Sequence, residues 1–600
     1  MNSELHFLKE FTYQKASGVY TAAKDGSGGE EFAYSDGDVA EEYVFSCIRD
    51  AGDVSDNSPE LVRWARDWSS YYHLAAGRAN HIRVLDLPRE LSVLELGSGC
   101  GAVSRYLGEH HREVHCVEGS PRRAAITRAR CRGLDNVKVY CADFRKLLLE
   151  AEYDMVLLNG VLEYAPVFFA AEGRSPGDAT AVLLALAKSA LRKNGILLIA
   201  IENKIGLKYW CGASEDHTGR LFDGIHGYPT PGTARTYSKR ELSQVLDGSG
   251  FGFRKFYSCF PDYKFPTSVL VDDHGAHRGV FIHNWIEYPA ENPGLDRSYL
   301  VHEGLAARSL ADAGLIHEFA NSFLVVASEH EPAGFDSTIK PEWLASKISV
   351  ANRDRTVHCV TKFFPKTKTI EKTLIDYNSS DRRDTKALGH AVETAKWISG
   401  NLLSWEVAEA VMSKHFRSAL LLVVAEYHEE LLKSFATGAN DDQGYPLLRG
   451  ECFDFIMGNI IRTAAGLEGI DNEWKMDRPL PVDYLLYRSL SYDVLGRNGR
   501  WLCHNVPDAD SFVIAMVRSL YPGYDEQRQA RNRSLESTIL SEIRGELGGT
   551  KWLSAEDGMA PWKRGVRKMA RKVPAGLRAR IVGLSGAINE KLRILFAQSS

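Results

Sequence analysis

The sequence lacks three features that would assign it to a special class of proteins. None of its apolar runs approaches the roughly 20 residues of a membrane span. Its ten cysteines show no CxxC spacing, and no charged-then-apolar signal stands at the N-terminus. These absences predict a cytoplasmic chain with reduced thiols. Its 600 residues exceed what one hydrophobic core supports, so we expect several domains.

Positive charge is concentrated near the end of the chain. The formal net charge is -5, yet the stretch from Trp562 to Arg593 carries ten Lys and Arg against one Glu. Apolar residues recur there on one helical face, which predicts an amphipathic tail bound to the inner membrane surface. We expect no nucleic acid, because no aromatic residues interleave these charges.

The stretch "VLELGSGCG", from Val93 to Gly101, reads as a buried strand followed by a tight turn, and "AVSRYLGEH" reads as the helix after it. A strand, turn and helix of this kind let a ligand lie against bare backbone at a helix N-terminus. The glycines alternate as GxGxG, whereas dinucleotide loops usually read GxGxxG. The spacing therefore argues against a dinucleotide loop, and an NAD-dependent Rossmann enzyme remains only as the alternative interpretation of this stretch.

Three more strand ends carry polar side chains. From Leu91 to Leu270 short β-rich runs alternate with helical segments, which predicts an α/β fold with a doubly wound parallel sheet. Glu118 ends the second strand, where a carboxylate can accept hydrogen bonds from ribose hydroxyls. Asp143 follows the third strand and can accept from an adenine amine, while Phe144 can pack on the ring. Asn159 ends the fourth strand.

This series resembles the class I S-adenosylmethionine-dependent methyltransferases. The resemblance implies S-adenosylmethionine as cofactor and the following cofactor-binding residues: Glu95, Gly97, Gly99, Gly101, Glu118, Asp143, Phe144 and Asn159. The segments "LRKNGILLIAIENKIGLKYWCGASEDHTG", "RTYSKREL" and "FPDYKFP" look similar to methyltransferases from bacterial O-antigen and lipopolysaccharide gene clusters. That similarity implies methylation of a sugar hydroxyl or sugar phosphate on a surface-polysaccharide or glycolipid precursor.

The acceptor site of an open α/β sheet lies beyond the carboxyl ends of its strands. Residues after the fourth and fifth strands include Glu163, Glu202, Asp216 and His217. We predict Glu163, Asp216 and His217 as catalytic, with His217 as the preferred base because an ordinary histidine pKa is near 6.5. Three adjacent residues in "EDH" are poor geometry for a closed metal site, so we predict no metal there.

The second half contains a spacing typical of phosphotransferases. Asp454 precedes Asn459 by five positions and Asp471 follows twelve later, which resembles the kinase and aminoglycoside-phosphotransferase fold. Upstream, "TVHCVTKFFP" reads as a strand presenting Lys362 to phosphates. Cys452 departs from that pattern, as does "DNE" in place of "DFG", and no glycine-rich loop is recognisable. The alternatives are a bifunctional kinase-methyltransferase that caps a glycan and binds ATP at these residues, or a noncatalytic glycan-binding module.

The predicted domain organisation has four parts. Residues 1–58 form an extended N-terminal arm, residues 59–270 the methyltransferase domain, residues 271–547 an α+β, kinase-like domain, and residues 548–600 the basic tail. A helical region with an aromatic face begins near Pro59.

Overall fold

The structure is a computed structural model that describes residues 5–22, 36–169, 173–273, 279–290, 297–349, 353–375, 388–390, 392–502, 505–506 and 508–545. The chain splits into two compact units. Among the described residues, the first unit contains those of 5–402, Ile461–Arg478 and 537–545, and the second contains those of Leu403–Ile460 and Pro479–Glu536. The predicted basic tail lies outside the described residues. Among the helices that are described, none is long and apolar enough to cross a membrane.

A parallel sheet forms the centre of the first unit. Its strands lie in the order β9-β8-β4-β5-β6-β3, and every neighbouring pair is parallel. Their bounds are β3 Val19–Ala22, β4 Ser92–Leu96, β5 Glu113–Glu118, β6 Val137–Cys141, β8 Tyr153–Asn159 and β9 Leu191–Glu202. The strand order reverses between β4 and β8. Such a reversal opens a crevice at the carboxyl ends of the strands, where open α/β sheets bind their ligands.

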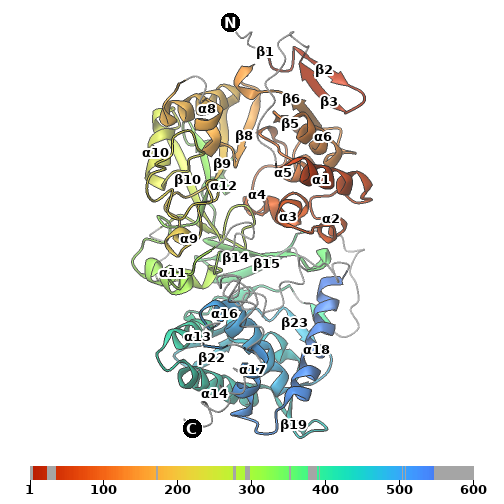
Figure 1. The fold of residues 1–600 in the computed structure, drawn as a ribbon, viewed down its shortest axis with the longest axis vertical. Helices are drawn as coiled ribbons and strands as arrows, with labels where there is room; N and C mark the ends of the chain where they lie inside the picture. Colours follow the sequence, from red (N-terminus) through yellow and green to blue (C-terminus); the bar gives the residue numbers. More distant parts are fainter. Residues whose placement is uncertain are drawn as a thin grey trace, which may run out of the picture. The chain divides into compact units, whose positions relative to one another are not determined.

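Helices cover both faces of this sheet. The crossover helices α5 (Ala102–His110) and α6 (Pro121–Arg130) lie on one side, and α8 (Pro176–Ala190) and α10 (Lys239–Gly248) lie on the other, as Figure 1 shows. Right-handed connections require this, because the chain moves in opposite directions from β4 to β6 and from β8 to β9. Ser120, Ser175 and Ser238 cap α6, α8 and α10 by accepting backbone N–H groups. The α/β prediction with a parallel-containing sheet is confirmed.

The sheet continues beyond the parallel strands with antiparallel ones. β12 (Ser322–Ser328) pairs with β9, and the order then runs β10-β11-β13-β14-β15-β17. The bounds are β10 Phe253–Phe260, β11 Ser268–Val271, β13 Ala345–Ile348, β14 Cys359–Phe364, β15 Thr369–Leu374 and β17 Ala395–Lys396. The structure thus corrects the domain boundary predicted after residue 270, which falls inside β11. Antiparallel strands need no crossover helix, so the alternating pattern stops while the sheet goes on.

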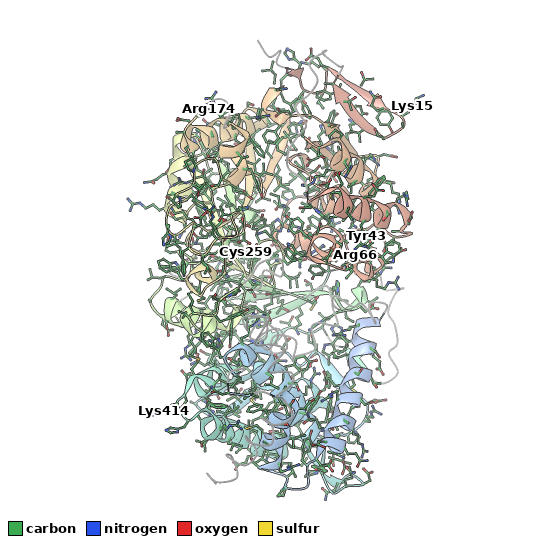
Figure 2. The ribbon with its side chains drawn as sticks, in the orientation of Figure 1. Lys15, Tyr43, Arg66, Arg174, Cys259 and Lys414 are labelled. Carbon is green, nitrogen blue, oxygen red and sulfur yellow. The ribbon has the colours of Figure 1, made fainter. Side chains whose placement is uncertain are left out.

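The N-terminal residues are also more ordered than the extended arm predicted for residues 1–58. β2 (Phe11–Gln14) and β3 form a hairpin, whose loop residue Lys15 is labelled in Figure 2. β3 joins the sheet beside β6, and α1 (Asp38–Asp50) buries Val44, Cys47 and Ile48. These three apolar residues have helical spacing, which indicates a helix. The acidic, glycine-rich composition of the surrounding residues led instead to the prediction of an extended arm.

Shorter elements complete the first unit. The helical region predicted from Pro59 consists of α2 Pro59–Arg63, α3 Trp68–Leu74 and α4 Asn80–Arg83. In its aromatic face, Trp68 and Tyr71 pack against Phe265 with ring centroids 5.8 and 4.9 Å apart. Cys259 of β10 is fully buried in the core (Figure 2). The remaining elements are β1 Leu5–His6, β7 Leu147–Leu148, α7 Ala165–Phe168, α9 Leu207–Trp210, α11 Glu303–Asp312, α12 Asp336–Ile339, β16 Leu388–His390, β18 Asn401–Leu402, β21 Ile460–Thr463, β22 Gly466–Gly469 and β23 Trp474–Met476.

The second unit is mainly helical. Its elements are α13 Leu403–Met412, α14 Phe416–Phe435, β19 Ala436–Asn440, β20 Pro446–Leu448, β24 Leu480–Pro481, α15 Val482–Ser489, α16 Arg497–Leu502, α17 Ala509–Arg518 and the first part of α18 Glu526–Arg544. The helix α14, of 20 residues, precedes Asp454 in the chain. The buried Arg528 binds the carboxylates of Asp441 and Asp483 at 2.6 and 2.7 Å, which ties α18 to α15 and to the β19–β20 turn.

Candidate active site

The glycine loop between β4 and α5 has one side open to a ligand. Gly97, Gly99 and Gly101 all have positive φ angles, of 82°, 57° and 82°. A Cβ atom at Gly97 would lie 2.7 Å from Val161 Cγ2, and one at Gly101 would lie 2.8 Å from Thr127 Cα. At Gly99 no described atom lies within 4 Å of that position. Two glycines therefore permit close packing, whereas Gly99 leaves bare backbone facing free space.

Glu118 lies beside Gly99 at the end of β5. Its Oε2 accepts the Gly99 N–H at 2.8 Å, and its Oε1 accepts the Ser120 N–H at 3.0 Å. The side chain is buried, and burial raises the pKa of its carboxyl group. Both backbone contacts fix the carboxylate at the edge of the open space next to Gly99. This is the position from which the predicted ribose contact would be made.

Glu95 supports the glycine loop from within the sheet. Its Oε2 accepts a hydrogen bond of 2.5 Å from the Ser104 hydroxyl, which holds the first turn of α5 against β4. The side chain is 1% exposed, and burial raises the pKa of Glu95 to about 7.

Asp143 and Phe144 follow β6, as predicted, but both already have partners. Arg145 binds the Asp143 carboxylate at 2.7 Å, and the Arg145 N–H donates to the same carboxylate at 3.1 Å. Phe144 packs edge-on against Phe168, with ring centroids 5.4 Å apart. An adenine amine would therefore share Asp143 with Arg145 or displace it.

The predicted catalytic residues Glu163 and His217 meet at the carboxyl ends of β8 and β9, together with Glu202. We call Glu163, Glu202 and His217 the carboxylate-histidine cluster. His217 Nε2 lies 3.3 Å from Glu202 Oε2, and its Nδ1 lies 3.2 Å from the Tyr164 hydroxyl. Asn159, at the end of β8, has a buried Oδ1 without a hydrogen-bond partner among the described residues. The ends of two neighbouring strands and one insertion thus converge on one point.

Two lysines stand on the other side of the cluster. Lys208 binds Asp216 at 2.7 Å and Asp262 at 2.5 Å, while Lys264 binds Glu202 and Asp216. Although burial acts in the opposite direction, Lys208 and Lys264 hold the pKa of Asp216 well below its usual range. Asp216 is therefore an ionised partner of two lysines, which suits it to positioning them rather than to accepting a proton. Sequence reasoning assigned no role to Asp262 and Lys264, although both lie in "FPDYKFP".

Protonation differs sharply between the members of the cluster. Burial, followed by repulsion from Glu202, raises the pKa of Glu163 to about 8. Burial alone would lower the pKa of His217, but the adjacent Glu202 carboxylate raises it to about 9. The Oε2 atom of Glu163 is buried and has no hydrogen-bond partner among the described residues. At neutral pH His217 therefore carries its proton. Among the described residues, Oε2 of Glu163 accepts no hydrogen bond and is available to a ligand.

Comparison with known proteins identifies the class of this site. Residues 93–171 match the model of a methyltransferase domain family, a range that holds the glycine loop, Glu118, Asn159 and Glu163. A search of curated proteins found no match.

Solved structures with a similar fold include several methyltransferases. An S-adenosylmethionine-dependent methyltransferase of Thermotoga maritima is 19% identical over 43% of this chain and 91% of its own, with a TM-score of 0.25. One from Mesorhizobium loti is 18% identical over 40% and 93%, with a TM-score of 0.23. The N-methyltransferase NodS of Bradyrhizobium japonicum, bound to S-adenosylhomocysteine, is 14% identical over 28% and 74%, with a TM-score of 0.19. Scores this low add nothing to the family match.

The family match and the geometry of the loop agree. The open side of Gly99 and the fixed carboxylate of Glu118 suit a nucleoside cofactor at a helix N-terminus. The chain therefore contains an S-adenosylmethionine-dependent methyltransferase domain, with S-adenosylmethionine as its cofactor. This finding decides against the NAD-dependent alternative.

Proposed function

We propose that the protein transfers the methyl group of S-adenosylmethionine to a hydroxyl group of a bacterial surface-polysaccharide or glycolipid precursor. The sequence segments that resemble enzymes of surface-polysaccharide clusters support the acceptor class. The single observation that carries the choice of a hydroxyl is the buried Oε2 of Glu163, which has no hydrogen-bond partner among the described residues. A sugar phosphate fits less well, because it is already ionised at neutral pH and needs no base.

The cluster supplies what a hydroxyl acceptor needs. In methyl transfer the acceptor oxygen bonds to the methyl carbon as the bond from carbon to sulfur breaks, so the three atoms must be aligned. The hydroxyl also loses a proton, and S-adenosylhomocysteine leaves. Glu163 takes that proton more readily than His217, because the lower pKa of Glu163 leaves more of it ionised near pH 7. We therefore assign the base role to Glu163 in place of His217, and an orienting role to His217.

The test is methylation of a panel of acceptors by the full chain. Saccharides and lipid-linked saccharides with free hydroxyls are incubated with S-adenosylmethionine, and S-adenosylhomocysteine release is measured. Glu163→Gln removes the proton acceptor, and we expect a loss of at least 100-fold in kcat. The control Glu150→Gln changes an exposed carboxylate. Methylation confined to phosphorylated acceptors, or a Glu163→Gln variant as fast as the wild type, would overturn the proposal.

A second candidate function concerns the second half of the chain. Lys362, predicted to contact phosphates, binds Asp86 at 2.8 Å. The lysine that reaches Asp471 is Lys372 on β15, which also binds Glu473 at 2.9 Å. We propose that Lys372 takes the role predicted for Lys362 in an ATP-dependent phosphotransferase. Asp454 and Asn459 belong to the second unit, where the Asn459 side-chain amide donates to the Asp454 carbonyl at 3.2 Å.

Labelling with γ-phosphate-labelled ATP separates the two lysines. We expect incorporation into an acceptor glycan to be lost in Lys372→Met and retained in Lys362→Met. Absence of labelling by the wild type would instead favour a noncatalytic glycan-binding module.

We further propose that the tail, residues 548–600, holds the enzyme at the inner membrane near a lipid-linked acceptor. Its eleven Lys and Arg residues support this. Sedimentation of the full chain with anionic vesicles but not with neutral vesicles is the expected result, and equal sedimentation with both would contradict it.

A further inference from the structure

The carboxylate-histidine cluster lies among charged side chains that pair with one another. Asp216 and Asp262 lie beside it, and Lys208 and Lys264 pair with them and with Glu202. Buried carboxylates need a compensating cation or a proton. Lys264 contacts Oε1 of Glu202, which leaves Oε2 of Glu202 facing His217.

The spacing of the cluster suits a metal ion. One ligand atom from each of Glu163, Glu202 and His217 lies within 4.8 Å of the other two. Metal bonds of about 2.0–2.2 Å place neighbouring ligand atoms roughly 3–3.5 Å apart. The 3.3 Å between His217 Nε2 and Glu202 Oε2 already meets this requirement.

The orientation of His217 is fixed from behind. Its Nδ1 is held by the Tyr164 hydroxyl, and its backbone N–H donates to Glu215 Oε2 at 2.8 Å. A ligating histidine characteristically uses its second ring nitrogen for such a contact, which points the first nitrogen at the metal. Here Nε2 is the nitrogen that points at the carboxylates.

Glu163 adds an independent observation. Its side chain is 1% exposed, yet its Oε2 has no hydrogen-bond partner among the described residues. A buried carboxylate oxygen without a donor is costly, and a bound cation removes that cost.

From these observations we propose a divalent-cation site formed by Glu163, Glu202 and His217. Two carboxylates and one imidazole suit a first-row transition metal such as Mn²⁺, Fe²⁺, Co²⁺ or Zn²⁺, and His217 releases its proton to solvent when the ion binds. The site deepens the proposed function and rests on it for its role. At an open coordination position the ion would bind the acceptor oxygen and lower the pKa of its hydroxyl, and the Glu163 oxygen that does not bind the ion would take the proton.

The probe is Mn²⁺, followed by electron paramagnetic resonance of the free ion during titration of the chelator-treated full chain. We expect one Mn²⁺ bound per chain. Thermal unfolding first checks that the Glu163→Gln variant is folded. We then expect its affinity for Mn²⁺ to be at least tenfold weaker than that of the wild type. Glu150→Gln is the control, because it removes the same charge from an exposed carboxylate outside the cluster. Absence of stoichiometric binding, or equal affinity in Glu163→Gln and Glu150→Gln, overturns the site.

A second measurement separates this inference from the proposed function. Methylation of an acceptor hydroxyl at the same rate with and without Mn²⁺ leaves the proposed function intact and refutes the cation's role. Stoichiometric Mn²⁺ binding that is lost in Glu163→Gln, without methylation of any hydroxyl acceptor, supports the site and refutes the proposed acceptor.

Discussion

Replacement of Gly99 by alanine tests where the cofactor lies. A new Cβ at Gly99 meets no described atom of the protein, so the folded chain accommodates its volume. The backbone φ of 57° costs an alanine about 1 kcal/mol in the free energy of unfolding. If S-adenosylmethionine lies against this backbone, the methyl group overlaps it and costs about 1–3 kcal/mol of binding free energy. That corresponds to an affinity about 5- to 150-fold weaker.

Gly133→Ala is the matched control for this experiment. Gly133 has a φ of 78° and likewise no described atom near its Cβ position. It lies between α6 and β6, at the amino ends of the strands, whereas the glycine loop lies at their carboxyl ends. Both variants should lose similar stability in thermal unfolding. Calorimetric titration with S-adenosylmethionine should show weaker binding only for Gly99→Ala. Equal affinity in the two variants would refute the position of the cofactor beside Gly99.

Three further predictions follow from the contacts of the site. Because the pKa of Glu163 is raised to about 8, kcat should rise with pH through about 8 as Glu163 loses its proton, and a profile flat from pH 6 to 9 would contradict its role as base. Asp143→Ala should weaken S-adenosylmethionine binding by about 1–3 kcal/mol in calorimetry, whereas Arg145→Ala, which frees the Asp143 carboxylate, should not weaken it. Lys208→Met leaves Asp216 and Asp262 with less compensation and should lower the free energy of unfolding by roughly 3 kcal/mol in urea titrations.

The cofactor loop was predictable because its chemistry is local. Gly97, Gly99 and Gly101 lie within one turn, and the strand before them and the helix after them are set by short-range patterns. Glu118 could be placed as well, since the second strand of such a unit runs parallel to the first and ends at the same edge. The sequence did not reveal which glycine has open space beside it, because that depends on Val161 and Thr127 packing against the other two.

The carboxylate-histidine cluster was only partly predictable. Parallel strands place Glu163 and Glu202 at one edge, but the chain folds His217 back onto them through an insertion whose path no periodic pattern describes. The lysine that approaches Glu202 comes from the segment after β10, which sequence reasoning treated as a family signature without a role. Glu163, Glu202 and His217 are distant in sequence and close in space, so the adjacent residues of "EDH" did not indicate the cluster.

The hairpin of β14 and β15 shows why a strand can be predicted correctly and its functional residue misassigned. Lys362 pairs across the hairpin with Glu371, so these two side chains share one face of the sheet. Lys372, one residue further on, points to the opposite face. Lys362 accordingly meets Asp86, and Lys372 meets Asp471 and Glu473. Both lysines lie on strands with similar composition, so only the register of the hairpin decides which of them reaches Asp471. The Lys372→Met and Lys362→Met pair tests that register as directly as it tests phosphotransfer, because a reversed result would require the hairpin to present its other face to Asp471.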